Sequence, residues 1–197
     1  MARQREFDTE ETLEKAMRLF WQKGYSETSV RDLVKGTGVA HAGLYAAFGD
    51  KRGLFEAALE RYAEFMLPLF DRLAAPGAGR QAIADFFATV ASSAVEGRFR
   101  HGCMVANTSV EIGAGTASGD GRGAAVVRRV LDRQLMAFEA AARQARVDGD
   151  ASPRLDPGRT AAGMVAIFYG VSALARAQAP HSAIHAASSA AVTLLDA

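Results

Sequence analysis

The sequence predicts an all-helical protein, in which a small three-helix domain precedes a larger helical domain. Three observations support this fold class. Apolar residues recur at three- and four-residue steps along most of the chain, and clusters of glycine and proline separate these stretches. No stretch alternates convincingly between apolar and polar residues, so we expect no sheet. We divide the chain into residues 1–50, a connecting helix over 51–74, and residues 75–197.

Three short helices are expected within the first fifty residues. The first carries an apolar stripe of Leu13, Ala16, Met17 and Phe20, can be capped by Asp8, and ends at Gly24. The second runs from about Ser29 to Lys35 and the third from about Ala40 to Ala47. Gly36 and Gly38 separate these two helices. Two short helices joined by a glycine-containing turn predict a helix-turn-helix.

The remaining helices are longer. The connecting helix over 51–74 contains Pro68, which removes a backbone donor, so we expect a kink or a break there. Pro76, Gly77 and Gly79 then indicate a linker. Helical patterns follow over 80–97, 101–112, 122–147, 157–178 and 182–195. Connectors rich in glycine or proline lie at 113–123 and 148–157.

Composition indicates an ordinary soluble globular protein. Of 197 residues, 49% are hydrophobic and 23% are charged, and no apolar run reaches the roughly 18 residues that a membrane helix needs. The polar N-terminus is not a secretory signal, and the single Cys103 excludes an internal disulfide. We therefore expect a cytoplasmic protein that has no membrane partner. The net charge of +1 argues neither for nor against a nucleic-acid partner, so that case depends on where the charges lie.

The predicted helix-turn-helix suits the major groove of DNA, because one helix fits the groove while its neighbour braces it. Phosphate contacts are expected from helix ends and from polar side chains on the groove side. Arg3 and Arg5 precede the first helix and are either a minor-groove arm or a disordered tail. The candidate backbone contacts are Thr28, Ser29, Arg31, Lys35, Tyr45 and Lys51.

The same residues carry a resemblance to a known family. The run from Thr28 to Val34, then Gly38-Val39, Gly43-Leu44-Tyr45, Phe48-Gly49-Asp50-Lys51 and Leu54-Phe55 resembles the DNA-binding domain of TetR-type transcriptional regulators, over roughly residues 8–62. The resemblance implies an all-helical homodimer that binds a palindromic double-stranded DNA operator, usually as a repressor. It also implies that a small-molecule effector bound by the C-terminal domain releases the DNA.

The recognition helix departs from the family pattern. Ala40 stands where the family often has a capping serine, and Gly43 stands where a serine or threonine often contacts a phosphate. Each change removes a hydrogen bond worth about 1 kcal/mol. His41 is the only obvious donor to a base edge, while Ala42 suits a thymine methyl group. We expect these four residues to face DNA and the intrinsic affinity to be modest.

The C-terminal half contains a candidate effector pocket. Cys103, Asn107 and Glu111 follow one another at four-residue steps and so share one helix face. Cys103 is either a buried, inert thiol or a sensor of electrophiles or oxidants whose pKa Arg98, Arg100 and His101 would lower. Most aromatic residues are expected in the core, and some line an apolar pocket between helices. The aromatic candidates are Phe65, Phe87, Phe138 and Phe168.

The last two helices have faces suited to a dimer interface. One face comprises Met164, Ile167, Phe168, Val171 and Leu174, and the other Ile184, Ala187, Ala191 and Leu195. Small residues, including Gly163 and Gly170, would allow close approach. His181 and His185 are too few for a structural zinc site, and the glycines at 113–123 form no nucleotide-binding motif, so we expect no metal and no cofactor. The alternatives are a helical ligand-binding protein or an enzyme without a DNA function.

Overall fold

The structure, a computed structural model, describes residues 7–113 and 121–197, and within these ranges it is helical throughout, with no strand. The helices are α1 (Thr9–Lys23), α2 (Val30–Thr37), α3 (His41–Phe48), α4 (Lys51–Leu73), α5 (Arg80–Val95), α6 (Met104–Gly113), α7 (Arg122–Val147), α8 (Pro157–Arg176) and α9 (His181–Thr193), followed by a 3₁₀ turn, η1 (Leu194–Asp196). The predicted all-helical fold is confirmed. The proposed minor-groove arm of Arg3 and Arg5 and most of the glycine-rich connector lie outside the described residues.

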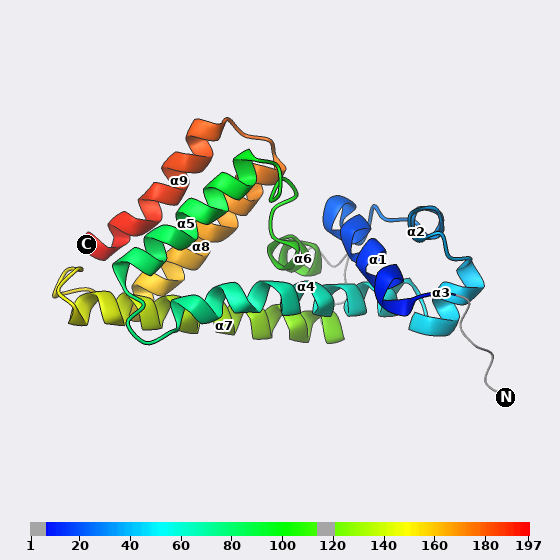
Figure 1. The fold of residues 1–197 in the computed structure, drawn as a ribbon, viewed down its shortest axis with the longest axis horizontal. Coiled ribbons are helices and arrows are strands. Elements are labelled where there is room, and N and C mark those ends of the chain that lie inside the picture. Colours follow the sequence, from blue (N-terminus) through cyan, green and yellow to red (C-terminus); the bar gives the residue numbers. More distant parts are fainter. Residues whose placement is uncertain (1–6, 114–120) are drawn as a thin grey trace.

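The molecule is elongated, and α4 and α7 lie side by side along its length (Figure 1). Helices α1, α2 and α3 form one end. Helices α5, α8 and α9 form the other end, and α6 lies between the two groups (Figure 1). Helix α4 packs on α1 and α3 near its start and on α5 near its end, so it connects both ends of the molecule.

Local sequence signals explain the boundaries of the N-terminal helices. The Asp8 carboxylate accepts hydrogen bonds from the first amides of α1 and satisfies donors that have no partner within the helix. Ser29 and Asp32 form a reciprocal capping box at the start of α2. Gly38 ends α2 in the left-handed conformation, with φ 77° and ψ 6°, which a residue with a Cβ atom adopts only at a cost. Of these signals, the turn at Gly38 sets the direction in which the chain leaves α2 toward α3.

Pro68 does not break α4, which runs through it from Lys51 to Leu73, so the expected break is absent. Pro68 leaves the carbonyl of Glu64 without its helical donor. Both residues are exposed, and water can therefore satisfy that carbonyl. The helix therefore continues through Pro68 with the disrupted bond facing solvent rather than the core.

Among the described residues, one helix, α8, is long and apolar enough to cross a membrane by length and composition alone. In the structure it packs against α7 and α9, and this packing buries part of its apolar face. Met164, Phe168 and Val171 are fully buried there. The buried side chains of the protein form one continuous hydrophobic cluster that extends from α1 to the 3₁₀ turn.

Candidate nucleic-acid interface and domain junction

Helices α2 and α3 are held together by buried leucines. Leu33 of α2 and Leu44 of α3 are completely buried, and Val39 in the turn between them is 9% exposed. Burying a leucine side chain stabilises a fold by about 1.5–3 kcal/mol, so these residues fix one helix firmly against the other. The opposite face of α3 consequently remains on the surface.

The exposed face of α3 begins with three neighbouring residues. Ala40, His41 and Ala42 are all exposed, as the sequence predicts for residues that would meet DNA. Tyr45 is half-buried, and its ring contacts the His41 ring one helical turn away, with 4.1 Å between ring centroids. The contact restricts both rings and holds the imidazole at the surface of α3. Ala40 caps the helix without a side-chain hydrogen bond, in line with its departure from the family pattern.

Arg31 and Lys35 are exposed one helical turn apart on α2, next to the turn that leads into α3. Ser29 is also exposed, but its hydroxyl donates to the Asp32 carboxylate at 2.7 Å and accepts from the Asp32 amide. This hydroxyl is already engaged in the cap. A contact of Ser29 with a phosphate would have to use its backbone or displace part of that cap.

Thr28 is predicted to stand at a helix N-terminus that favours a phosphate, and the structure shows that its side chain is not available for such a contact. It is completely buried, and its hydroxyl donates to the Gly24 carbonyl at 2.6 Å. Thr28 therefore closes the turn between α1 and α2. Sequence alone could not separate this role from capping, because a threonine hydroxyl performs either one before a helix.

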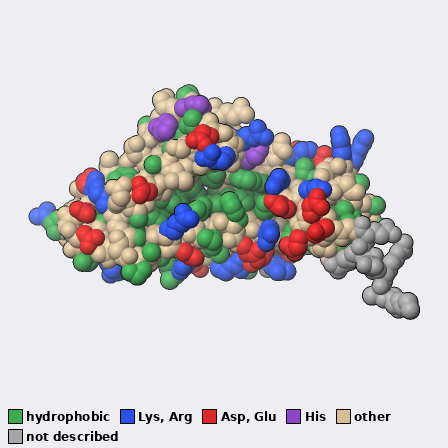
Figure 2. Space-filling view, viewed as in Figure 1, with side chains coloured by type: hydrophobic (Ala, Val, Ile, Leu, Met, Phe, Trp, Pro, Cys, Tyr) green, Lys and Arg blue, Asp and Glu red, His purple; other side chains and the backbone are tan. Residues whose placement is uncertain are grey.

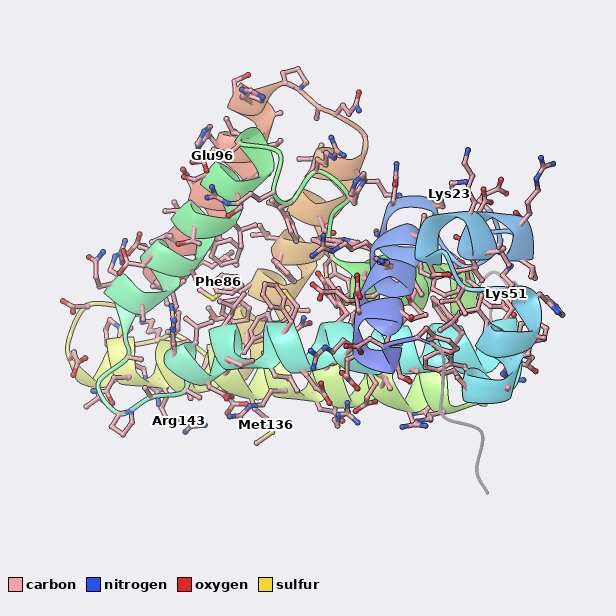
Figure 3. The ribbon with its side chains drawn as sticks, turned by 45° about the vertical axis from the view of Figure 1, so that its right-hand side comes forward. Lys23, Lys51, Phe86, Glu96, Met136 and Arg143 are labelled. Carbon is pink, nitrogen blue, oxygen red and sulfur yellow. The ribbon has the colours of Figure 1, made fainter. Side chains whose placement is uncertain are left out.

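Lys51 lies at the start of α4 (Figure 3). Its ammonium group stands 4.3 Å from the centre of the Tyr25 ring. A cation over an aromatic face is attracted by the negative charge of the ring face. Burial lowers the pKa of Lys51, while nearby Glu111 and Glu27 oppose that shift. Tyr25 thus holds the lysine near the first turn of α4, where a phosphate contact is expected.

Gly43 is less open than the sequence suggests. A Cβ atom at this position would lie 3.0 Å from Val39 Cγ1 and 3.1 Å from a ring carbon of Phe7. The Phe7 ring therefore packs over α3 in the space that a side chain would occupy. Glycine at this position trades a side-chain phosphate contact for packing of the segment that precedes α1.

Three groups of hydrogen bonds join the N-terminal helices to the C-terminal domain. The indole N–H of Trp21 donates to the Gly102 carbonyl at 2.6 Å. Nη1 of Arg176, in the last turn of α8, donates to the carbonyls of Trp21 at 3.2 Å and His101 at 3.3 Å. The Glu111 carboxylate accepts from the amide of Tyr25 at 3.0 Å. We call this set of contacts the domain junction.

Glu111 therefore does not form a pocket wall with Cys103 and Asn107, as the four-residue spacing predicts, but faces the turn after α1. Asn107 is half-buried, and its amide donates to the His101 carbonyl at 2.9 Å. Cys103 is 1% exposed, and burial raises its pKa. The expected lowering by Arg98, Arg100 and His101 is absent, because burial disfavours a thiolate. These are the properties of an inert thiol.

The aromatic pocket candidates separate into two groups. Phe87, Phe138 and Phe168 are buried and pack tightly in the C-terminal core; for example, the centroids of the Phe87 and Phe138 rings are 5.6 Å apart. Phe65 is 68% exposed and does not join them. Position 65 lies within the helical repeat of apolar residues along α4, but Tyr62, Met66 and Phe70 occupy the buried face.

Sequence reasoning missed the domain junction. Trp21 and Arg176 are 155 positions apart, and Trp21 and Gly102 are 81 apart. No local pattern indicates such pairs. The one available signal was the single tryptophan at the end of α1, since a buried indole N–H generally needs a partner.

The chain matches two family models that together span most of its length. Residues 13–58 match the model described as bacterial regulatory proteins, tetR family. Residues 79–191 match the tetracyclin repressor-like C-terminal domain. The chain belongs to the TetR family. This finding confirms the resemblance, the fold class and the assignment to DNA-binding transcriptional regulators.

Relatives and solved structures agree with this assignment. The chain is 34% identical over 179 residues to the HTH-type transcriptional repressor ComR of Escherichia coli K12. The matched region covers 86% of this chain and 80% of ComR. It is 27% identical, with a TM-score of 0.75 and coverage of 97% and 98%, to a cysteine mutant of the TetR family regulator CifR in complex with 26 bp operator DNA. A TetR family regulator from Agrobacterium tumefaciens shares the fold, with a TM-score of 0.82 at 16% identity and coverage of 95% and 97%.

Proposed function

We propose that this protein represses transcription by binding a palindromic operator as a homodimer, and that a small-molecule effector releases it. The observation that carries the DNA-binding proposal is the exposed face of α3, held by buried Leu33 and Leu44 directly after the left-handed turn at Gly38. A rigid helix offered in this way fits the major groove. The likeness to ComR, a named repressor, and to an operator-bound structure supports the direction of regulation.

We assign contacts with base edges to His41, Ala42 and Ala40, which are exposed at the start of α3. Arg31, Lys35 and Lys51 would neutralise phosphates on either side of the groove. Tyr45 would offer its hydroxyl to the backbone while its ring steadies His41. Ser29 and Gly43 would contribute backbone amides, whereas the buried Thr28 would act only through the turn that it closes.

The test is a selection from random duplexes at a stated salt concentration, followed by affinity measurements on variants. The intact protein should enrich a palindrome whose half-sites lie about one helical turn, roughly 34–36 Å, apart. Arg31→Ala combined with His41→Ala should abolish the preference for that palindrome. Arg128→Ala, which removes an exposed arginine from α7, should leave it intact and serves as the control. Full operator affinity in the double variant would refute the residue assignment.

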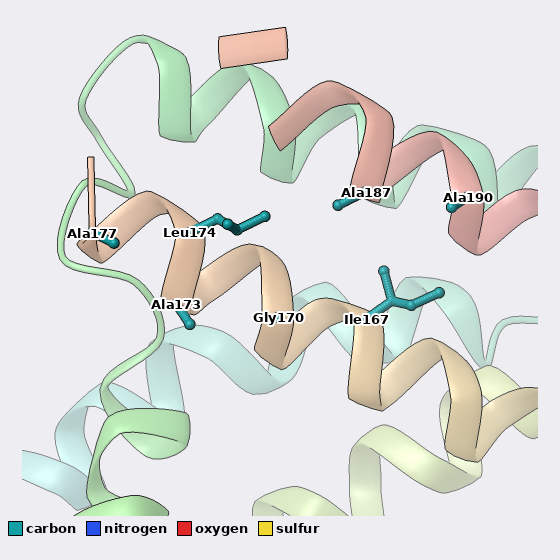
Figure 4. Close-up of a pocket in the computed structure, with 7 residues that line it drawn as sticks. All are labelled: Ile167, Gly170, Ala173, Leu174, Ala177, Ala187 and Ala190. Carbon is teal, nitrogen blue, oxygen red and sulfur yellow. The ribbon is translucent and has the colours of Figure 1, made fainter. Parts of the chain in front are cut away.

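We propose the dimer interface on α8 and α9, where an apolar groove of about 510 Å³ lies between the two helices (Figure 4). The groove is lined by Ile167, Gly170, Ala173, Leu174, Ala177, Ala187 and Ala190. Ile167, Gly170, Leu174 and Ala187 agree with the predicted interface. Met164, Phe168, Val171, Ile184, Ala191 and Leu195 instead pack inside the protomer. A second copy of the same groove would cover this face by two-fold symmetry.

We propose the effector site at a pocket of about 280 Å³ between α4 and α5. Leu69, Leu73, Phe86 and Val90 give it apolar walls, and Arg72 and Asp85 add charged groups at its lining. Figure 2 shows hydrophobic side chains gathered over the middle of this face, in the region between α4 and α5. An apolar molecule with one polar group fits such a lining. Because α4 also contacts α1 and α3, a ligand bound between α4 and α5 would tilt these DNA-binding helices.

We propose no enzymatic role and a cytoplasmic location. ComR and CifR, reported above, are named regulators, and a protein that binds operator DNA acts where the chromosome lies. An enzyme with this fold would turn over a substrate in the absence of DNA. The selection described above therefore distinguishes the regulator from either alternative.

A further inference from the structure

A second, polar pocket lies at the domain junction. It has a volume of about 410 Å³ and is lined by Gln22, Arg100, His101, Arg176 and Gln178. Gln22 belongs to α1, and Arg100 and His101 precede α6. Arg176 ends α8, and Gln178 follows two residues later. The pocket therefore joins the DNA-binding helices to the C-terminal domain. The proposed function uses none of these side chains.

The charged side chains that line this pocket are all positive. Its lining includes two arginines and no carboxylate. Arg176 uses Nη1 for the carbonyls of Trp21 and His101, and in the described part of the chain its Nε and Nη2 have no partner. Arg100 donates from Nε to Nε2 of His101 at 3.1 Å. The imidazole nitrogen that accepts this bond is unprotonated, so in the neutral ring the proton is on Nδ1.

The arginines also act on His101. Burial, followed by the charges of Arg100 and Arg176, lowers the pKa of His101. The part of this shift that comes from the two arginines reflects the positive potential that their side chains create at the pocket. An oxyanion would be attracted by the same potential and would meet guanidinium donors in the planar arrangement that suits carboxylates and phosphates.

The backbone at Gln178 adds a second observation. Its φ of 54° is the only positive φ at a non-glycine residue in the described chain. The amide of Ala179 donates to the Leu174 carbonyl at 3.0 Å and that of Gln178 to the Ala175 carbonyl at 3.1 Å, which closes α8 in the manner that normally selects glycine. Gln178 adopts the left-handed conformation at an energetic cost, and its side chain brings an amide group to the pocket.

We propose that this pocket binds a small oxyanion carrying at least two negative charges, as phosphate or carboxylate groups, between Arg100, Arg176 and Gln178. Charge-assisted bonds from a guanidinium to an oxyanion are stronger than bonds to neutral carbonyls, so the bound ion would recruit the unused donors of Arg176. Gln22 of α1 would complete the site from the other side. This inference goes beyond the proposed function, because it concerns a second site and a different class of ligand from the effector pocket between α4 and α5.

Trp21 provides the readout. It is the only tryptophan in the chain, its indole lies 6.1 Å from the His101 ring between centroids, and its carbonyl binds Arg176. The full-length protein is titrated separately with inorganic phosphate and with citrate at constant ionic strength set by sodium chloride, while Trp21 emission is recorded. A saturable change is expected. Saturation by phosphate alone or by citrate alone identifies the preferred oxyanion, and calorimetry gives an independent affinity.

Two variants and one control decide the outcome. Arg100→Gln should weaken binding of the preferred ion about tenfold, because it removes one charge-assisted contact. Gln178→Gly relieves the backbone strain, so the fold is retained, and should weaken binding about fivefold. Arg98→Gln removes a neighbouring arginine that pairs with Glu96 outside the lining and should change nothing. Absence of saturation with both ions, or equal affinity in wild type and Arg100→Gln, would overturn the proposal.

Discussion

Removing the Glu111 carboxylate should loosen the junction between the two domains. This carboxylate accepts from the Tyr25 amide at 3.0 and 3.3 Å and from the Ser26 amide at 3.4 Å. A hydrogen bond to a charged group contributes about 1.5–3 kcal/mol when well formed. The bond to Ser26 is long and exposed, and water would replace part of the bond to Tyr25. We therefore expect Glu111→Ala to lower the free energy of unfolding by about 1.5 kcal/mol.

Two measurements test this loss. For a chain of this size, a change of about 1.5 kcal/mol corresponds to a decrease in Tm of about 3–6 °C. Calorimetry measures that decrease, provided that the two domains unfold together. Amide hydrogen exchange locates it, since the Tyr25 and Ser26 amides should exchange faster while the Leu33 amide in α2 remains protected.

The matched control is Glu139→Ala, which removes an exposed carboxylate on α7 that pairs with Arg143. A surface pair of this kind contributes about 0.3–0.5 kcal/mol, so this variant should lower Tm by no more than about 1–2 °C. Glu111→Gln keeps one acceptor oxygen and should fall between the two alanine variants. An unchanged Tm in Glu111→Ala, together with unchanged exchange at Tyr25, would refute the role of Glu111 in the junction.

Three further predictions follow from the exposed residues of α2, the groove on α8 and the buried thiol. Lys35→Ala should weaken binding to all duplexes alike and reduce the slope of log affinity against log salt by about 0.9, as measured by fluorescence anisotropy over a range of salt concentrations. Gly170→Glu should convert a dimer into a monomer in light-scattering measurements, because a Cβ at Gly170 meets only open space and the charge would enter the apolar groove. Cys103 should react slowly with a thiol reagent in the native state and rapidly in denaturant, since burial both covers the thiol and raises its pKa.

One experimental result would contradict each of these predictions. A salt slope unaffected by Lys35→Ala would place that lysine away from phosphates. A Gly170→Glu protein that still dimerises would show that the interface lies elsewhere. Ala140→Glu, on the exposed side of α7, is the matched control and should leave the molar mass measured by light scattering unchanged. Fast, stoichiometric labelling of native Cys103 would restore the hypothesis that it senses electrophiles.

The sequence predicted those features that depend on neighbours in the chain. Helix boundaries followed Asp8, Ser29 and Gly38, because capping and left-handed turns act over a few residues. The exposed face of α3 followed from the register of Leu33 and Leu44. The family resemblance strengthened both interpretations, since the turn and the recognition helix occupy a contiguous stretch.

The features that sequence did not predict depend on contacts between distant segments. Glu111 lies at the right spacing for a pocket wall, but its actual partner is Tyr25, 86 positions earlier. Phe65 follows the helical repeat yet falls outside the buried stripe of a helix that contacts neighbours on only part of its circumference. Thr28 could have capped a helix and instead bonds the Gly24 carbonyl. In each case the residue type was compatible with two environments, and only tertiary packing selected one.

The continuity of α4 through Pro68 has a mechanical consequence. Its 23 residues form a rod about 35 Å long. A rotation of about 5° around one end of such a rod moves the other end by about 3 Å, and in a symmetric pair the two movements add to about 6 Å. That distance is about half the width of a major groove, which is about 12 Å. A ligand bound beside Leu69 and Leu73 would need to rotate α4 only slightly. The two DNA-binding domains of the dimer would then no longer match the spacing of the major grooves.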